Sequence, residues 1–359
     1  ATEQTREAYM AALFAEIGGR AKDYSDRTVT SIFIGGGTPS LLSGEQIGQL
    51  MDRIREQFAM AQDAEITMEV NPGTANAEKL RNFYTAGINR LSIGMQSAQA
   101  EELKNLGRIH DFEGFCQVYR EAVEAGFTNI NVDIMSGLPG QTLASYRDTL
   151  EKVLHLEPMP QHISAYSLIV EEGTPFAAMA ERGELPLPEE ETERAMYEET
   201  IEVLSKYGFH RYEISNYARD GYECRHNVGY WIRRDYLGFG IGAASLIDNV
   251  RFQNEKSLGA YLAHPLESRE EEQTLTVQDR MEETMFLGLR LTRGVSCVDF
   301  AEQYGRTVEE VYGEVIARNV ADGLLTVTER KENQKKDRFL ALTKRGLDLS
   351  NYVMAQFLF

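Results

Sequence analysis

Short β-branched runs alternate five times with longer amphipathic segments between residue 8 and about residue 170. Apolar residues in the longer segments recur at helical spacing, as in GEQIGQLMDRIREQF, whereas the short runs are typical of strands. A chain in which strands and helices alternate places its strands in parallel, either in a barrel or in a doubly wound sheet, and the pattern leaves both open. The expected strands are 29–34, 65–70, 90–95, 129–135 and 162–170.

A polar or glycine-rich stretch follows each expected strand: GGGTPS, NPGT, QSAQ, SGLPGQT and EEGTPF. Because the carboxyl ends of parallel strands form the ligand-binding side of α/β folds, we expect these loops to meet at one place. The glycine triplet lies in neither GxxxxGK[ST] nor GxGxxG, so a nucleotide-phosphate loop is not indicated. Taken alone, three glycines after a strand more often form a tight turn.

Four charged or polar side chains near these strand ends favour a ligand over a turn. Glu69, Gln96, Arg108 and Asp133 offer a cation for a carboxylate, and carboxylates for ribose hydroxyls or an ammonium group. The alternative for Arg108 and Asp133 is that each pairs with another charged residue of the chain.

Composition excludes several classes of protein. The 359 residues suggest two or three domains, and a hydrophobic content of 42% is ample for a buried core. Acidic residues outnumber basic ones by 56 to 37, and the net charge of -19 disfavours nucleic acids and anionic membranes as partners. There is neither a run of 18 apolar residues nor a signal-like start, so we expect a cytoplasmic protein without an integral membrane segment.

Beyond residue 170 the regular alternation is lost. Residues 171–273 are aromatic-rich, and we expect the acidic run 267–273 to be a solvated linker. After it come helical patterns and two strand candidates, 324–329 and 338–343, which predict a winged-helix-like domain. From residue 279 onward there are 12 basic and 13 acidic residues, too few basic ones for a DNA reader. The expected domains are 1–170, a barrel; 171–273, an α+β accessory region; and 274–359, winged-helix-like.

Ordered motifs carry a resemblance to a known family. GGGTPS, EVNP, NRLSIGMQS, LGRIH and VDIMSGLPGQT resemble, over residues 29–176, the radical S-adenosylmethionine (radical SAM) group that contains the oxygen-independent coproporphyrinogen dehydrogenases. The later motifs FHRYEISNYA, CRHNVGYW, YLGFGIGAAS, GLRLTRGV and LTKRGLDLSN are similar to the haem-chaperone branch of that group. The resemblance implies an α/β fold: a partial (β/α)6 barrel of TIM type, here lacking its first strand.

The resemblance also implies a function. It implies a protein that binds haem and delivers it to respiratory apoproteins, with S-adenosylmethionine and a [4Fe-4S] cluster as further cofactors. The alternative is a coproporphyrinogen dehydrogenase, which converts two propionates into vinyl groups with loss of CO2. A third hypothesis, an unrelated α/β-barrel enzyme for a phosphorylated substrate, lacks a lysine-bearing phosphate loop. Whether the protein is an enzyme stays open at this point.

Individual residues follow from the same resemblance. Arg108 is expected to face the carboxylate of S-adenosylmethionine, and Asp133 its ribose. In HNVGYW a histidine could bind haem iron axially and aromatic rings could cover the porphyrin, with Cys224 as an alternative thiolate ligand. A lone histidine beside aromatic residues is otherwise more often structural. The residues expected to contact S-adenosylmethionine are Gly36, Gly37, Thr38, Glu69, Gln96, Arg108, Asp133, Ser167 and Ala244; those expected to contact haem are His226, Tyr230 and Trp231.

The cluster motif of that group is not found. Its CxxxCxxC pattern is absent, and Cys116, Cys224 and Cys297 are too widely spaced to replace it. We expect these three to be buried or incidental thiols. The sequence begins without Met, so we expect the cluster cysteines upstream of Ala1 and assign no catalytic residue or metal ligand within the chain.

Overall fold

The chain forms two compact units. The computed structural model describes residues 2–267, 269–332 and 335–359. The sheet unit comprises Arg27–Arg211 and Ser215–Glu223, and the terminal unit comprises Ala1–Asp26, Tyr212–Ile214 and Cys224–Phe359. This division follows contacts between residues, and the three-domain division at residues 170 and 273 stays a prediction.

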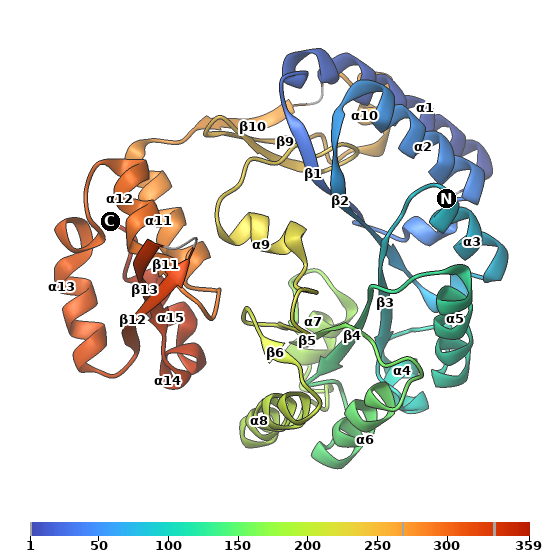
Figure 1. Ribbon diagram of the computed structural model, residues 1–359. Coiled ribbons are helices and arrows are strands. Elements are labelled where there is room, and N and C mark those ends of the chain that lie inside the picture. The colour runs from blue at the N-terminus through green and yellow to red at the C-terminus, as the bar shows by residue number, and fades with distance from the viewer. Residues whose placement is uncertain (1, 268, 333–334) are drawn as a thin grey trace. The chain divides into compact units, whose positions relative to one another are not determined.

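A seven-stranded sheet organises the sheet unit. Its strands run in the order β1-β2-β3-β4-β5-β7-β6, and β1 to β5 are parallel, each beside its predecessor. A doubly wound sheet would reverse its strand order at a switch point, so the consecutive order and the curled sheet in Figure 1 identify a partial barrel, as the resemblance implied. The strands are β1 (Thr28–Ile34), β2 (Ala59–Val70), β3 (Arg90–Gln96), β4 (Ile130–Ser136), β5 (His162–Ser167), β6 (His210–Arg211) and β7 (Asn216–Ala218).

Helices cover the outer face of this sheet (Figure 1). Successive side chains of a strand point to opposite faces of the sheet. In β3, Leu91, Ile93 and Met95 are fully buried in a core shared with helix residues, whereas the residues between them are mostly polar. The helices of the unit are α2 (Gly44–Gln57), α3 (Ala77–Thr85), α4 (Ala100–Asn105), α5 (Phe112–Ala125), α6 (Leu143–Leu154), α7 (Pro175–Glu181) and α8 (Glu190–Lys206).

Local sequence signals set the helix ends. Ser43 caps α2 in a reciprocal pair with Gln46, and Thr142 caps α6 in the same way with Ser145. Helix α5 ends at Gly126, whose φ of 110° is left-handed and favours glycine. These caps set where α2 and α6 begin and where α5 ends.

The first part of the terminal unit joins α1 to a small antiparallel sheet of order β10-β9-β8. Glu16 of α1 is fully buried and forms a 3.0 Å ion pair with Arg20. It also accepts hydrogen bonds from Asn254 (2.7 Å) and Tyr261 (2.8 Å), so a polar cluster ties α1 to β9 and α10. The elements are α1 (Glu3–Arg20), α9 (Arg225–Trp231), β8 (Ala244–Ile247), β9 (Val250–Asn254), α10 (Leu258–Ala263) and β10 (Arg269–Thr274).

The last part of the terminal unit is the winged-helix-like region. The two strand candidates pair antiparallel as β12 and β13, with β11 on the other side of β13. Met285, Phe300, Val353 and Phe357 are buried in the core of this region. The elements are α11 (Val277–Gly288), β11 (Val295–Ser296), α12 (Cys297–Tyr304), α13 (Val308–Ala321), β12 (Leu325–Glu332), β13 (Lys335–Leu342), α14 (Lys344–Asp348) and α15 (Ser350–Ala355).

The structure corrects two expectations about strands. The acidic run 267–273, predicted to be a linker, largely forms β10, which pairs with β9; residue 268 lies outside the described residues. Its side chains are exposed, so the charges face solvent while the backbone completes the sheet. The predicted strand 162–170 ends at Ser167. Both predictions relied on the charge and hydropathy of side chains. These properties indicate whether a side chain faces solvent, but they do not determine which backbone segments pair as strands.

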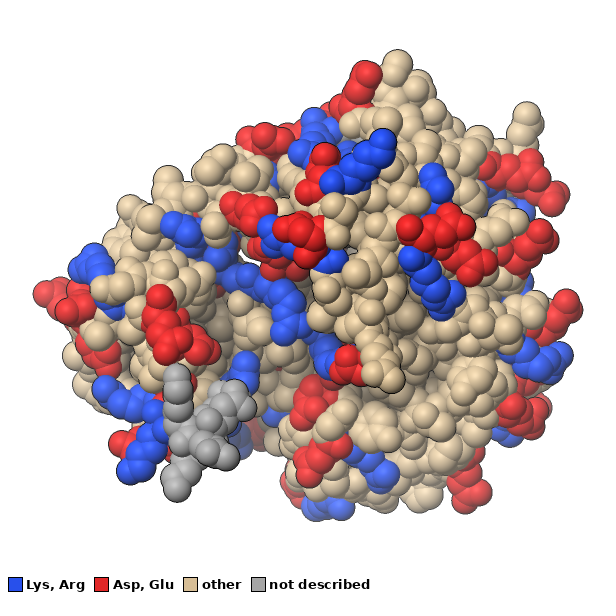
Figure 2. Space-filling view, turned by 45° about the horizontal axis from the view of Figure 1, so that its top comes forward, with Lys and Arg blue, Asp and Glu red and all other residues tan. Residues whose placement is uncertain are grey.

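Charged side chains are scattered over the visible face in Figure 2, with acidic and basic groups often side by side and broad uncharged areas between them. Among the described residues, no helix is long and apolar enough to cross a membrane.

Candidate functional site

The glycine loop after β1 exposes its backbone. Gly36 has a φ of 81°, and a Cβ atom built on Gly36 or Gly37 would meet no atom within 4 Å. A Cβ on Gly35 would lie 2.9 Å from the carboxylate carbon of Glu69. The first glycine therefore permits close packing on Glu69, and the other two leave open space beside the backbone.

Hydrogen bonds anchor this loop to the next one. The Ser40 hydroxyl accepts a hydrogen bond from the Asn71 N–H at 3.0 Å and lies 2.6 Å from the Thr74 hydroxyl. The Lys79 ammonium donates to the carbonyls of Ser40 (2.8 Å) and Thr74 (3.1 Å). The GGGTPS and NPGT loops are thus held together. Thr38 precedes the short 3-10 turn that carries Ser40, and its carbonyl accepts from the Leu41 N–H.

Two carboxylates from different strands lie within electrostatic reach of each other. Burial raises the pKa of Glu69 at the end of β2, the charge of Asp133 on β4 raises it further, and a hydrogen bond from the Gly36 N–H opposes the rise. Burial also raises the pKa of Asp133. Asp133 accepts hydrogen bonds from Asn131 (2.7 Å) and Ser92 (3.2 Å). The pair forms an electronegative centre next to the glycine loop.

A polar layer lies on the inner face of the sheet beneath Asp133. The guanidinium of Arg90 is almost fully buried, and its positive charge partly opposes the rise that burial causes in the pKa of Asp133. The fully buried His162 lies 2.6 Å from the Asn131 Oδ1 atom, and burial followed by the charge of Arg90 holds its pKa well below the ordinary value. Sequence reasoning missed this layer. The signal for it is the alternation of polar and apolar residues in RLSIGMQ and in INVDIMS.

Gln96 has an unusual backbone. Its φ of 67° is left-handed for a residue with a side chain, and the register between β3 and β4 shifts between Gly94 and Gln96. Such bulges re-aim side chains and occur next to active sites. The amide oxygen of Gln96 accepts a hydrogen bond from the hydroxyl of Tyr166 at 3.0 Å.

Arg108 follows α4 and is half-buried. Within the described residues it forms no ion pair, and its charge reaches Tyr166, whose pKa it lowers against a larger increase caused by burial. Helix α4 is anchored by the buried carboxylate of Glu102, which accepts hydrogen bonds from the hydroxyls of Ser97 and Ser145, both at 2.6 Å. The alternative in which Arg108 pairs with a carboxylate of the chain is not seen in the described part of the structure.

The remaining predicted S-adenosylmethionine residues divide between the two units. Ser167 ends β5 in the sheet unit, where its hydroxyl lies 3.1 Å from that of Ser136. Ala244 begins β8 in the terminal unit and is exposed. Within the sheet unit, the glycine loop, Glu69, Gln96 and Ser167 therefore stand at the carboxyl ends of parallel strands, and Asp133 lies near the end of its strand.

The HNVGYW segment forms α9 in the terminal unit. His226 and Tyr230 lie one turn apart, with 3.0 Å between the His226 Nε2 atom and the Tyr230 hydroxyl. The Tyr230 ring contacts that of Tyr236 edge to face, with centroids 4.7 Å apart. The guanidinium of Arg290 lies 4.3 Å from the ring centroid of Trp231. Cys224 is fully buried at the N-cap of this helix, a position that disfavours it as a haem ligand.

The cysteines do not fit a metal cluster. Burial raises the pKa of Cys116 on α5, and raises that of Cys297, at the start of α12, to about 11, so both thiols are protonated at neutral pH. Thiolates, not thiols, bind iron. Over residues 2–267, 269–332 and 335–359 there is no group of three or more His, Cys, Asp or Glu side chains that could hold a metal ion. These residues therefore do not hold a [4Fe-4S] cluster.

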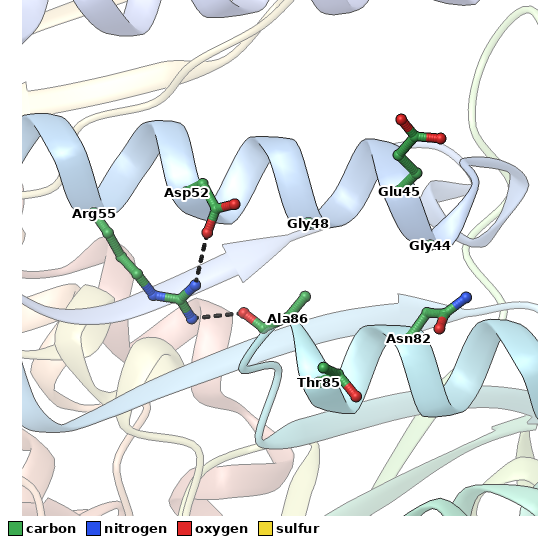
Figure 3. Close-up of a pocket in the computed structure, with 8 residues that line it drawn as sticks. All are labelled: Gly44, Glu45, Gly48, Asp52, Arg55, Asn82, Thr85 and Ala86. Atoms are coloured by element: carbon green, nitrogen blue, oxygen red, sulfur yellow. Dashed lines mark hydrogen bonds and ion pairs between the residues drawn. The ribbon is translucent and has the colours of Figure 1, made fainter.

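A separate surface pocket of about 390 Å³ lies between α2 and α3 (Figure 3). Arg55 closes one end, where it donates to the carbonyl of Ala86 at 2.6 Å and lies 3.5 Å from the carboxylate of Asp52. Gly44 and Gly48 also line the pocket; Gly44 packs closely on Asn82, whereas a Cβ atom on Gly48 would meet no atom within 4 Å. None of the predicted site residues lines this pocket.

Comparison with known proteins defines first a class and then a family. Residues 3–153 match the Radical SAM superfamily, and residues 275–349 match the HemN C-terminal domain. The coproporphyrinogen III oxidase (HemN) of Escherichia coli, a radical SAM enzyme, is a similar solved structure, with a TM-score of 0.82 and 26% identity over 99% of this chain and 84% of that one. The parallel half-barrel with its glycine loop is therefore a radical SAM fold.

The curated relatives are more specific. The chain is 37% identical to the heme chaperone HemW of Bacillus subtilis, over 99% of this chain and 92% of the relative. It is 35% identical to the HemW of Lactococcus lactis, over 99% and 91%. The HemW of Escherichia coli is 37% identical over 84% of this chain and 78% of the relative. The chain belongs to the heme chaperone HemW family, which confirms the resemblance found in its motifs.

Proposed function

We propose that this protein is a haem chaperone, which binds haem and passes it to respiratory apoproteins. The observation that carries the proposal is the similarity to curated heme chaperones over 99% of the chain, at 37% and 35% identity. The solved oxidase is similar over the same extent at 26% identity. A cytoplasmic location and respiratory apoproteins as recipients are parts of the proposal.

The proposal places S-adenosylmethionine at the carboxyl ends of β1 to β5. The open space over Gly36 and Gly37 would accommodate the methionyl chain along the backbone. The guanidinium of Arg108, without an ion pair in the described part of the chain, suits the ligand carboxylate, and Asp133 suits the ribose hydroxyls. Glu69 supplies a second carboxylate, for the ammonium group. When bound, the ligand would supply a sulfonium centre.

For three further residues of the proposal, the side chain offers little that would recognise the ligand. Thr38 and Ser167 stand at strand ends of the sheet unit and would contact the ligand largely through their backbones. Ala244, at the start of β8, is kept in the proposal from the resemblance alone. Since the described cysteines do not fit a cluster, no chemical step through a cluster is derived for this chain.

The proposed haem residues are His226, Tyr230 and Trp231 on α9. An imidazole is an axial ligand for haem iron, and the aromatic rings offer apolar area for a porphyrin face. The half-buried positions of all three residues support this assignment, because they combine exposed area with a fixed orientation.

The oxidase structure makes coproporphyrinogen dehydrogenation the second candidate function. The two are separated by titrating the anaerobically reconstituted protein with haem, followed by absorbance, and by assaying vinyl product from coproporphyrinogen on the same sample. Stoichiometric haem binding without product is expected. Turnover without stable haem binding would overturn the chaperone proposal.

A further inference from the structure

Tyr166 joins two strands across the proposed S-adenosylmethionine site. It lies on β5, and its hydroxyl donates to the amide oxygen of Gln96 on β3 at 3.0 Å, across the intervening β4. We infer that Tyr166 is a positioning residue that fixes the amide of Gln96 for the ligand. The inference rests on the proposed function and adds a residue that the sequence motifs did not single out.

The hydrogen bond decides which way the Gln96 amide faces. A glutamine amide has one acceptor oxygen and one donor NH2 group, and the two are nearly equivalent in shape. Because Tyr166 donates to the oxygen, the NH2 group stays available as a donor to a ligand acceptor. A Cβ atom on Gly94 would lie 2.9 Å from the Gln96 Nε2 atom, so the absent side chain at Gly94 leaves room for this orientation.

The backbone of Gln96 supports a functional reason for the contact. A left-handed φ at a residue with a side chain costs free energy and persists where the surrounding structure imposes it. Here the register shift and the bond from Tyr166 both constrain one residue. A strained backbone with an oriented side chain is typical of a ligand site.

Tyr166 also lies among the other proposed ligand residues. Burial raises its pKa most, the charges of Asp133 and Glu69 raise it further, and that of Arg108 lowers it. The phenol is therefore protonated at neutral pH and acts as a donor. By contrast, Tyr119 on α5 donates at 2.7 Å to the Pro158 carbonyl. Tyr119 offers a matched control, because its buried hydroxyl is hydrogen-bonded in the outer helix layer.

The test is calorimetric titration with S-adenosylmethionine of the wild type, Tyr166→Phe, Tyr119→Phe, Gln96→Gly and the double variant Tyr166→Phe/Gln96→Gly. Glycine accepts the left-handed backbone at position 96, so Gln96→Gly removes the amide without adding strain. Tyr166→Phe should weaken binding about three- to tenfold, the usual worth of one hydrogen bond. In the Gln96→Gly background it should cause no further loss, and Tyr119→Phe should bind like the wild type.

The outcomes separate the inference from the proposal beneath it. If the wild type binds and Tyr166→Phe binds equally well, the inference is wrong and the proposed site stands. If Tyr166→Phe lowers the affinity for S-adenosylmethionine by the same factor in the wild-type and in the Gln96→Gly background, Tyr166 does not act through Gln96. The inference is then wrong as well. A wild type that binds no S-adenosylmethionine would overturn the proposed cofactor site and, with it, this inference.

Discussion

The His226 Nε2 atom lies 3.0 Å from the hydroxyl of Tyr230, one turn later on α9. The same two rings are in edge-to-face contact, with centroids 4.9 Å apart. A haem iron bound through Nε2 would have to displace this hydroxyl. The proposed axial ligand is therefore held in a defined orientation, and its hydrogen bond competes with ligation.

Haem titration of His226 and Tyr230 variants tests this competition. His226→Ala should weaken haem binding and shift the Soret band. Tyr230→Phe should strengthen binding about three- to tenfold, because the competing hydrogen bond is lost. The exposed His264, changed to Ala, is the control and should leave the titration unaltered. If His226→Ala titrates like the wild type, the histidine is structural and haem binds elsewhere.

Filling the space beside the glycine loop should block S-adenosylmethionine. Gly37→Val adds bulk where no atom lies within 4 Å, so the fold should persist while affinity falls about five- to hundredfold. Gly36 is a poorer choice, since its φ of 81° strains any side chain. Gly48→Val, on the outer face of α2 in equally open space, is the control. Calorimetry showing equal affinity for Gly37→Val would remove the glycine loop from the site.

The raised pKa of Glu69 predicts opposite effects on stability and binding. A carboxyl group whose pKa is higher in the folded than in the unfolded protein reduces stability at pH values above its unfolded-state pKa. The reason is that the folded protein disfavours the charged form. Glu69→Gln should therefore raise the melting temperature at pH 7 to 8 by about 1 to 3 °C, a gain that shrinks as pH falls. Its S-adenosylmethionine affinity should be lower, and the wild type should lose affinity as pH falls.

Thermal melts over about pH 5 to 8 measure the stability of Glu69→Gln, and calorimetry over the same range measures its affinity for S-adenosylmethionine. Glu113→Gln, an exposed change on α5, is the control for loss of one negative charge. A Glu69→Gln protein that is less stable and binds normally would show that Glu69 serves the fold rather than the ligand.

His162 should make the protein sensitive to acid. Its pKa is well below the ordinary value in the folded state, so the unfolded chain takes up a proton that the folded chain cannot. As pH falls below about 6.5, the wild type should lose stability relative to His162→Gln by about 1.4 kcal/mol per pH unit. Urea unfolding at several pH values measures the difference, with the exposed His155→Gln as control. A difference that does not change with pH would contradict the prediction.

Part of the candidate site could be predicted from the sequence because loops at strand ends carry recognisable residues. Glu69 and Gln96 each lie at the end of a strand-like run, the glycine triplet follows another, and Arg108 lies in the LGRIH motif of the resemblance. Tyr166 and Arg90 escaped notice because each lies within a strand, where a polar residue is ordinarily read as surface. Only the curled sheet turns those residues toward one interior.

The sequence by itself determined the order of strands and helices, the loops with unusual residues and the family. It could do so because periodicity, turn residues and motifs are local along the chain. The resemblance implied a partial barrel, and only the tertiary structure showed how its strands pair, that the acidic run pairs as a strand, and that Tyr166 contacts Gln96. These relationships join residues far apart in sequence, and they depend on backbone pairing and burial, which no local pattern records.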